Sequence, residues 1–389
     1  MTERMEQAGR RVVERLVSSG CEAYWVGGCV RDKLLGRPLK DIDIATSAKP
    51  DDVLRLFAHA IPTGLQHGTV TVVEDGMPYE VTTFRREAAY EDHRRPTGVE
   101  FISELNEDLR RRDFTINAMA LDASGALIDP FGGQADLRRS VLRCVGEPQE
   151  RFEEDALRML RCIRFACEYG MTIEERTWLA LLDQAPLLRH IAMERVHAEL
   201  ERIVGGAGPD RGVELLASSE LLAHTKEALD WPIATAAAGG RAVESPWNGR
   251  LAELDAPELR WAYWLLRQGV DSAQAKAGFA RLRFSTGSSA SIVKLLQVQE
   301  WMEAWLLRGG EAGASKAASA SLASAGAGAA EGAGVSSANA RADASAGAAE
   351  GEGAGKASAD AERAGGGAEA PALREALARA SVRYGAGAV

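Results

Sequence analysis

Two aspartates separated by one residue are the first side chains in this sequence that could do chemistry. Asp41 and Asp43 alternate with Ile42 and Ile44, a pattern typical of a β-strand. Because successive strand side chains point to opposite faces, both carboxylates are expected on one face and both isoleucines in the core. Adjacent carboxylates repel each other unless a cation lies between them, and Mg²⁺ prefers such oxygen ligands. The pattern favours a magnesium site, whereas acids that keep a strand edge soluble are the alternative.

A glycine turn just upstream changes the balance between these two interpretations. A short apolar strand ends at Val26, Gly27 and Gly28 follow it, and a helix is expected from Val30 to Leu35. Two glycines allow backbone N–H groups to approach a bound anion such as a nucleoside triphosphate. The turn and the acids together predict a phosphate site next to a metal site.

These motifs resemble those of a known family. The runs at 27–32, 34–36 and 41–46 are similar to the head of the class II tRNA nucleotidyltransferases. That family comprises the CCA-adding enzymes and their bacterial poly(A) polymerase relatives, within the DNA polymerase β superfamily. The resemblance covers about the first three hundred residues, with motifs in family order and spacing. It implies an α+β fold in which a nucleotidyltransferase head with a mixed β-sheet precedes an all-helical neck, body and tail.

The resemblance also implies roles for individual residues. The segment ending at Asn117 resembles the family's ribose-reading motif, in which Asp113 would accept hydrogen bonds from the sugar hydroxyls and Arg112 would face phosphate. The implied metal ligands are Asp41 and Asp43. Glu80, on a strand expected over 79–85, is either a third catalytic acid or the partner of a neighbouring cation. The implied nucleotide contacts are Gly27, Gly28, Arg31, Arg112, Asp113, Asn117, Glu154, Asp155, Arg158 and Arg161.

A second acid–arginine group is expected on one continuous helix from Arg151 to Cys167. Its apolar stripe predicts one buried side, formed by Phe152, Ala156, Met159, Leu160 and Ile163. On the other side, Glu154 and Asp155 lie four and three residues before Arg158, so contacts between them are expected. Surface ion pairs of little energetic consequence are the alternative.

The run Glu-Asp-Ala-Leu-Arg that contains these residues resembles the family's base-recognition motif. A carboxylate only accepts hydrogen bonds, and a guanidinium only donates them. Asp155 and Arg158 would therefore suit the pairing edge of cytosine or adenine and leave uracil or guanine with unpaired groups. Glu154 would orient Arg158. The segment 193–203, similar to the family's Glu-Arg neck motif, is expected to brace this helix with ion pairs.

Composition is that of a globular, cytoplasmic protein. The chain has 389 residues, 46% of them hydrophobic and 26% charged, with no apolar run long enough for a membrane span and no apolar signal core at its start. The five cysteines form no Cys-x-x-Cys pair and are expected to be reduced. The net charge of -10 is unfavourable for RNA binding, but arginines crowd the stretch from 138 to 164.

The expected organisation has five parts. A head spans 1–140, a neck with the base-recognition helix 141–205, and a helical body 206–308. A disordered Ala/Gly/Ser-rich linker or insertion is expected over 309–370, and a tail helix over 371–389. The polar stretch 86–99 predicts a mobile loop, resembling the flexible loop of family members that add A. No strand is expected after residue 137.

The resulting functional hypothesis is template-independent addition of C, C and A from CTP and ATP to the 3′ end of tRNA, with release of pyrophosphate and Mg²⁺ as cofactor. The partners are then tRNA, ATP and CTP, without a membrane; a homodimer is left open. An A-adding specialist or a poly(A) polymerase of the same chemistry is the nearest alternative. A non-catalytic RNA-binding module is a further one, disfavoured because Asp41, Asp43, Asp113, Asp155 and Arg158 are all present.

Overall fold

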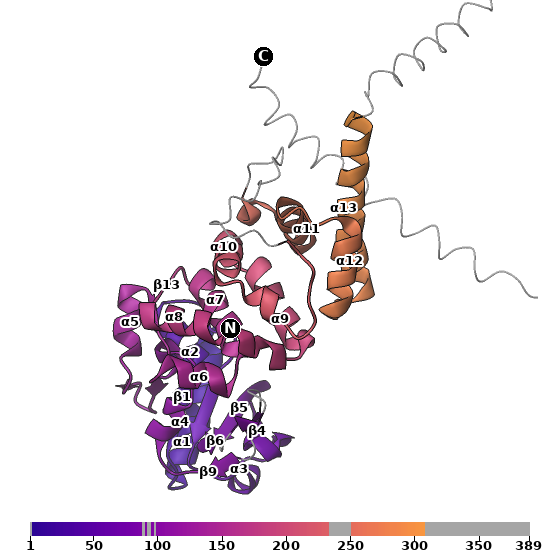
Figure 1. Ribbon diagram of the computed structural model, residues 1–389. Helices are drawn as coiled ribbons and strands as arrows, with labels where there is room; N and C mark the ends of the chain where they lie inside the picture. The colour runs from indigo at the N-terminus through magenta and orange to yellow at the C-terminus, as the bar shows by residue number, and fades with distance from the viewer. Residues whose placement is uncertain (1, 88–89, 92–94, 97–98, 233–249, 308–389) are drawn as a thin grey trace, which may run out of the picture. The chain divides into compact units, whose positions relative to one another are not determined.

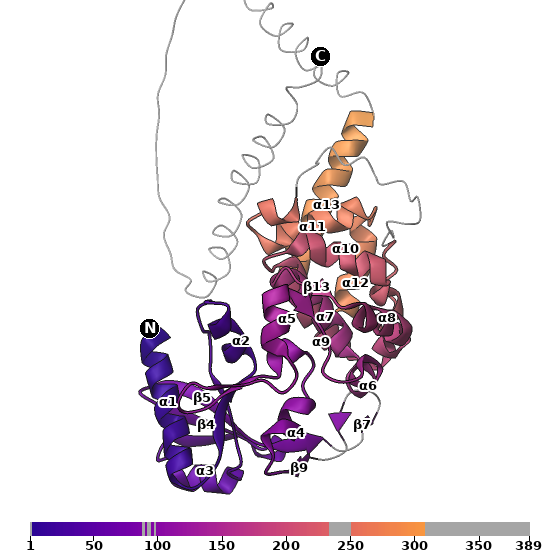
Figure 2. The same cartoon turned by 90° about the vertical axis from the view of Figure 1, so that its left-hand side faces the viewer.

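The computed structural model (Figures 1 and 2) describes residues 2–87, 90–91, 95–96, 99–232 and 250–307. All of them belong to one compact unit. The linker expected over 309–370 and the tail helix expected over 371–389 lie outside the described residues.

The centre of the head is a seven-stranded mixed sheet with the order β11-β10-β1-β2-β5-β4-β3. Within it only β2 and β5 pair in parallel; the other neighbours are antiparallel. The mixed sheet predicted from the resemblance is therefore confirmed. The strands are β1 (Ala23–Val26), β2 (Asp43–Thr46), β3 (Ala60–Gly64), β4 (Thr69–Glu74), β5 (Met77–Thr83), β10 (Ala120–Leu121) and β11 (Leu127–Ile128).

Helices cover both faces of this sheet. Helix α1 (Thr2–Ser18) packs on β1, β4 and β5, and α3 (Pro50–Leu56) packs beside β3. The buried side chains of α1 recur at helical spacing, so its apolar stripe is what holds it to the sheet. On the other face, Leu105 and Leu109 of α4 (Leu105–Arg110) pack with Val26, Ala45 and Phe84. The short helix α2 (Gly28–Leu34) follows β1 and begins two residues earlier than predicted.

The stretch 86–99 differs from the prediction of a loop. Its described residues form two short antiparallel strand pairs: β6 (Arg85–Glu87) with β9 (Val99–Phe101), and β7 (Tyr90–Glu91) with β8 (Arg95–Pro96). The prediction failed because it was based only on the lack of apolar side chains that the segment could bury. A two-stranded ribbon satisfies backbone N–H and C=O groups without doing so.

The rest of the described chain is mainly helical. A two-stranded parallel pair, β12 (Val141–Leu142) and β13 (Thr172–Ile173), corrects the expectation that no strand follows residue 137. Its strands are two residues long and too short to show an alternating pattern. The helices are α5 (Gly133–Arg139), α6 (Pro148–Glu154), α7 (Leu157–Glu168), α8 (Glu175–Gln184), α9 (Met193–Val204), α10 (Pro209–Ser219), α11 (Pro257–Arg267), α12 (Ser272–Arg281) and α13 (Thr286–Leu307).

One contiguous hydrophobic cluster runs from α1 through the sheet and the neck helices to α13. In the body it is aromatic: the rings of Phe279 and Phe284 have centroids 4.6 Å apart, and those of Trp261 and Trp264 lie 5.3 Å apart. The domain boundaries given above stay predictions, because head and body share this cluster. All five cysteines are unpaired. Among the described helices, none is both long and apolar enough to cross a bilayer.

The contact between Gly133, at the start of α5, and the backbone of Thr115 gives a test of this packing. A Cβ atom at position 133 would lie 2.2 Å from the carbonyl oxygen of Thr115. We expect Gly133→Ala to lower the free energy of unfolding by about 1–3 kcal/mol, the range for overpacking. The matched control is Gly287→Ala in α13, where nothing lies within 4 Å. It should leave stability unchanged or raise it by up to about 1 kcal/mol. Equal urea midpoints for the two variants would contradict the packing described here.

Candidate active site

The paired acids lie at the start of β2, in the middle of the sheet. Asp43 is the first residue of β2 and pairs with Val26 on one side and Glu80 on the other. Asp41 is exposed just before the strand. Ile42 and Ile44 are each 1% exposed, as predicted, so they fix the backbone that presents the two acids. Glu80 is exposed on β5 next to Asp43. It therefore brings a third negative charge close to the two aspartates.

The negative charges around Asp41 and Asp43 favour a bound cation. Burial and the charges of Asp41 and Glu80 together raise the pKa of Asp43 to about 6, with Arg112 opposing them. A divalent cation would relieve that repulsion, so the donor set suits Mg²⁺. No three His, Cys, Asp or Glu side chains among the described residues converge tightly enough to hold a metal alone. A cation here would therefore take its other ligands from substrate phosphate or water, the usual arrangement for Mg²⁺.

The glycine turn lies against an arginine. Gly27 has φ of 76°, a left-handed conformation that favours glycine. A Cβ atom at this position would lie 2.8 Å from Nη1 of Arg112. A side chain at this position would therefore collide with the guanidinium of Arg112. Arg112 stands beside both Gly27 and the charge of Asp43, as its predicted phosphate role requires.

Arg31 lies inside the protein and has several partners. Its guanidinium is 6% exposed, and it donates to both carboxylate oxygens of Asp32 at 3.0 and 3.1 Å and to Oδ1 of Asn117 at 2.5 Å. It also lies 4.4 Å from the ring centroid of Tyr169, at the end of α7. These contacts make Arg31 a link between α2 and the neck. A phosphate contact for it stays a prediction.

Asp113 is the junction between head and neck. Oδ2 accepts from Nε and Nη2 of Arg161, at 2.9 and 2.6 Å, and Oδ1 accepts from Nδ2 of Asn117 at 3.0 Å and from the N–H of Phe114 at 2.8 Å. Burial opposes its ionisation, but Arg161 and Asn117 outweigh burial and hold the pKa at about 2. All four acceptor positions are thus taken within the protein. A ribose hydroxyl would have to displace one of these donors.

The expected continuous helix from 151 to 167 is wrong. Helix α6 ends at Glu154, and α7 begins at Leu157, because Asp155 adopts an extended conformation with φ of -141° and ψ of 101°. Asp155 then accepts from the N–H of Leu157 at 3.1 Å, next to the start of α7. Periodicity missed the break because the apolar stripe continues across it: Phe152, Ala156, Met159, Leu160 and Ile163 are all buried, as predicted.

The break separates Asp155 from Arg158. Arg158 pairs with Glu154, which orients it as predicted, and its Nη2 donates to the carbonyl of Arg111 at 2.9 Å. Asp155 instead pairs with Arg195 of α9 at 2.7 Å. The expected contact between Asp155 and Arg158 is therefore absent from the described ion pairs, although both flank the N-terminal end of α7.

Helix α9 braces this region, which confirms the prediction for 193–203. Besides the pair between Arg195 and Asp155, Glu199 is 3% exposed and accepts from Nε of Arg164 at 2.6 Å. Sequence reasoning missed Arg164 because it lies on the buried side of α7. It also missed Asp108 in α4, whose spacing of three and four residues from Arg111 and Arg112 was a visible signal.

The two predicted clusters meet at consecutive residues. Arg112 faces the glycine turn and the paired acids, while Asp113 binds Arg161 of α7. The carbonyl of Arg111 receives Arg158. The acids of the head therefore lie within electrostatic range of Arg112, and the residues on either side of Arg112 contact the arginines of α7.

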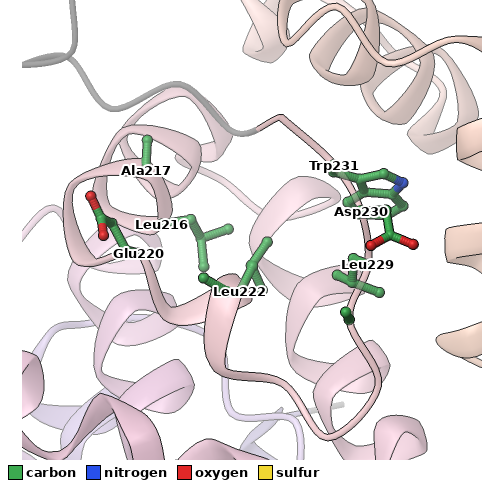
Figure 3. A pocket seen from close by; sticks show the side chains of 9 residues that line it. Leu216, Ala217, Glu220, Leu222, Leu229, Asp230 and Trp231 are labelled. Atoms are coloured by element: carbon green, nitrogen blue, oxygen red, sulfur yellow. The ribbon is translucent and has the colours of Figure 1, made fainter.

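A separate cavity of about 410 Å³ lies in the body (Figure 3). Its walls come from α10, from the 3-10 turn η4 (Leu221–His224), and from the chain leading to Trp231. The lining is mainly apolar, with Glu220 and Asp230 as its acids, and Asp230 pairs with Arg281. No residue predicted to bind nucleotide or metal lines it, so it is not part of the candidate active site.

Comparison with known proteins shows which family the chain resembles. The family profile described as "Poly A polymerase head domain" matches residues 23–143, and that described as "Probable RNA and SrmB- binding site of polymerase A" matches 170–231. The CCA-adding enzyme of Geobacillus stearothermophilus is 51% identical over 213 residues, covering 55% of this chain and 53% of the relative. That of Bacillus cytotoxicus is 41% identical over 313 residues, covering 79% and 76%.

Solved structures give the same picture. The chain matches the "Crystal structure of Bacillus stearothermophilus CCA-adding enzyme in complex with CTP" with a TM-score of 0.65 and 39% identity, covering 75% of this chain and 69% of that chain. The alignments with the first curated relatives, such as the Geobacillus stearothermophilus enzyme, span about half of those proteins' length.

Replacing Asp113 with asparagine tests the junction. Its folded-state pKa of about 2 lies below the ordinary value of 3.8, so the ionised carboxylate stabilises the fold at neutral pH, and this contribution is lost as the pH falls through the two values. At pH 7, Asp113→Asn should lower the free energy of unfolding by about 2 kcal/mol. The difference from wild type should shrink as the pH falls from about 4 to about 2.

Urea unfolding at several pH values measures this difference. The control is Glu150→Gln on α6, whose side chain is 68% exposed and which should match wild type throughout. A difference for Asp113→Asn that stays constant with pH would contradict the assigned ionised state.

Proposed function

The chain belongs to the family of CCA-adding enzymes, and on that premise we propose that it adds C, C and A from CTP and ATP to the 3′ end of tRNA. The observation that carries this proposal is the joining of the two clusters through Arg112 and Asp113. A nucleotide whose triphosphate lies beside Gly27 and Arg112 is then within the same set of contacts as Arg158. The cytoplasmic location stays a prediction, and the possible homodimer stays open.

The head residues would act on the triphosphate. Asp41 and Asp43 would hold Mg²⁺, which supplies neutralisation of phosphate charge when bound. Gly27 leaves room for the phosphates beside the backbone, and Arg112 donates hydrogen bonds to them from a fixed position. The 3′-hydroxyl of tRNA forms the new bond to the α-phosphorus while the bond to pyrophosphate breaks. Such in-line transfer requires mainly positioning and charge neutralisation from the protein.

The neck residues would select the base. Arg158 is 8% exposed, and its ion pair with Glu154 fixes the orientation of the guanidinium. The remaining N–H groups therefore point in a defined direction. Asp155 lies at the same helix end and supplies acceptors. In the described structure both side chains have protein partners, so base binding requires them to exchange Arg195 and the carbonyl of Arg111 for the nucleotide. Selection of C and A over U and G then follows from the donor-only and acceptor-only character of the pair.

An incorporation assay tests the activity. Wild-type protein with Mg²⁺ and tRNA lacking its terminal triplet should add two residues from CTP alone and the complete triplet from CTP and ATP. Asp41→Asn should lower incorporation by about 10³-fold or more, because charge stabilisation at the reacting phosphate is lost, while tRNA binding in a filter assay stays within about twofold of wild type. Long A tracts would indicate a poly(A) polymerase, A added only to tRNA already ending in CC an A-adding specialist, and no turnover a binding module.

Arg158→Ala tests the base-reading role. Loss of the guanidinium should lower the preference for CTP over UTP, and for ATP over GTP, by about 10- to 100-fold, the scale of one unpaired buried polar group. The measured quantity is the ratio of kcat/KM values, which a reduced fraction of folded enzyme does not change. Arg189→Ala, an exposed arginine of the neck, is the control and should keep the wild-type ratio. An unchanged ratio in Arg158→Ala would refute the role.

A further inference from the structure

Asp108 is a buried carboxylate that is not among the residues predicted to bind nucleotide or metal. It lies in α4 and is 1% exposed. Aspartate is seldom buried to this degree unless it is paired, because removing an ion from water is costly. Its partners therefore indicate what the side chain is for.

Those partners come from two places, the residues that follow α4 and the start of β6. Oδ1 accepts from Nε of Arg111 at 3.0 Å and from the backbone N–H of Arg85 at 3.3 Å. Oδ2 accepts from Nη2 of Arg112 at 3.3 Å. Burial opposes ionisation of Asp108, but the two guanidinium groups outweigh it, and its pKa is lowered. Asp108 thus carries a charge that both neighbouring arginines share.

The other side of Arg112 faces the site. Its Nη1 reaches the carbonyl of Asn117 at 3.5 Å and is the atom that a Cβ at Gly27 would meet. Its Nε is buried and has no hydrogen-bond partner in the described part of the chain. A buried, unpaired N–H of a guanidinium is costly, and an anionic oxygen would satisfy it. The nucleotide phosphates are the anions that the proposed reaction brings here.

We infer that Asp108 is a positioning residue for nucleotide binding: it anchors Arg112 through Nη2 and leaves Nη1 at the glycine turn, where the triphosphate is proposed to lie. Without this anchor, the carboxylates of Asp41 and Asp43 become competing partners for the guanidinium. Arg112 would then neutralise acids that the proposed reaction needs free for the metal. The inference rests on the proposed function, because it assumes that the anion is a nucleoside triphosphate.

The experiment measures CTP binding by calorimetry in the presence of Mg²⁺ and without tRNA. Asp108→Asn should weaken CTP binding about 10-fold or more, the scale of one charge-assisted hydrogen bond. The control is Asp210→Asn in the body. Asp210 is half-buried and accepts from the backbone N–H groups of Leu251 and Ala252 at 2.8 and 3.1 Å, and none of these residues is predicted to bind nucleotide or metal. This variant should lose stability but keep the CTP dissociation constant within about twofold of wild type.

A double-mutant cycle separates positioning from general loss of structure. If Asp108 acts through Arg112, adding Asp108→Asn to Arg112→Ala should weaken CTP binding no further, whereas independent effects would add. Should Asp108→Asn fail to fold, Asp108→Glu replaces it in the cycle, since its longer side chain displaces Arg112 and is expected to weaken binding. Wild-type affinity in the folded variant, or full additivity with Arg112→Ala, would overturn the inference.

The outcome also separates this inference from the proposed function. If wild-type protein binds no CTP and incorporates none, the proposed function fails. If wild-type protein binds and incorporates CTP but the Asp108 variants bind it equally well, only the positioning role fails.

Discussion

The structure depends on how charge is distributed along one short segment, residues 108–113. Asp108 and Asp113 are both buried acids, and each is neutralised by arginines: the first by Arg111 and Arg112, the second by Arg161. Removing one member of such a set leaves an uncompensated charge in the interior, which is strongly destabilising. The requirement that every buried charge be paired therefore fixes the segment. Because consecutive side chains of the segment point to different elements, it also joins the head to α7.

Much of the fold and site could be predicted from the sequence. Alternation of acid and isoleucine correctly predicted that Ile42 and Ile44 are buried, although β2 begins only at Asp43, and the turn at Gly27 was found from glycine alone. These signals are local: each depends on residues within one strand or one turn. The bracing role of α9 was inferred from a motif, and its pair with Asp155 agrees with that inference.

The parts that could not be predicted depend on distant contacts. A carboxylate and an arginine three residues apart are equally suited to pair with each other or with other partners. Asp155 is drawn to Arg195, forty residues further on, and α6 ends where the backbone turns to make that contact possible. The carboxylate oxygens of Asp113 similarly accept hydrogen bonds from Arg161 and Asn117. Local spacing tells which side chains can meet, but the tertiary structure decides which ones do.

Helix α9 also has a consequence for how base preference can change. It forms an ion pair through Arg195 with Asp155, just before α7, and another through Glu199 with Arg164, within α7. Neither Arg195 nor Glu199 is among the groups proposed to touch a nucleotide. On the proposed base-reading role, substitutions in this supporting helix would change which bases are accepted, while the residues proposed to make the contacts keep their identities.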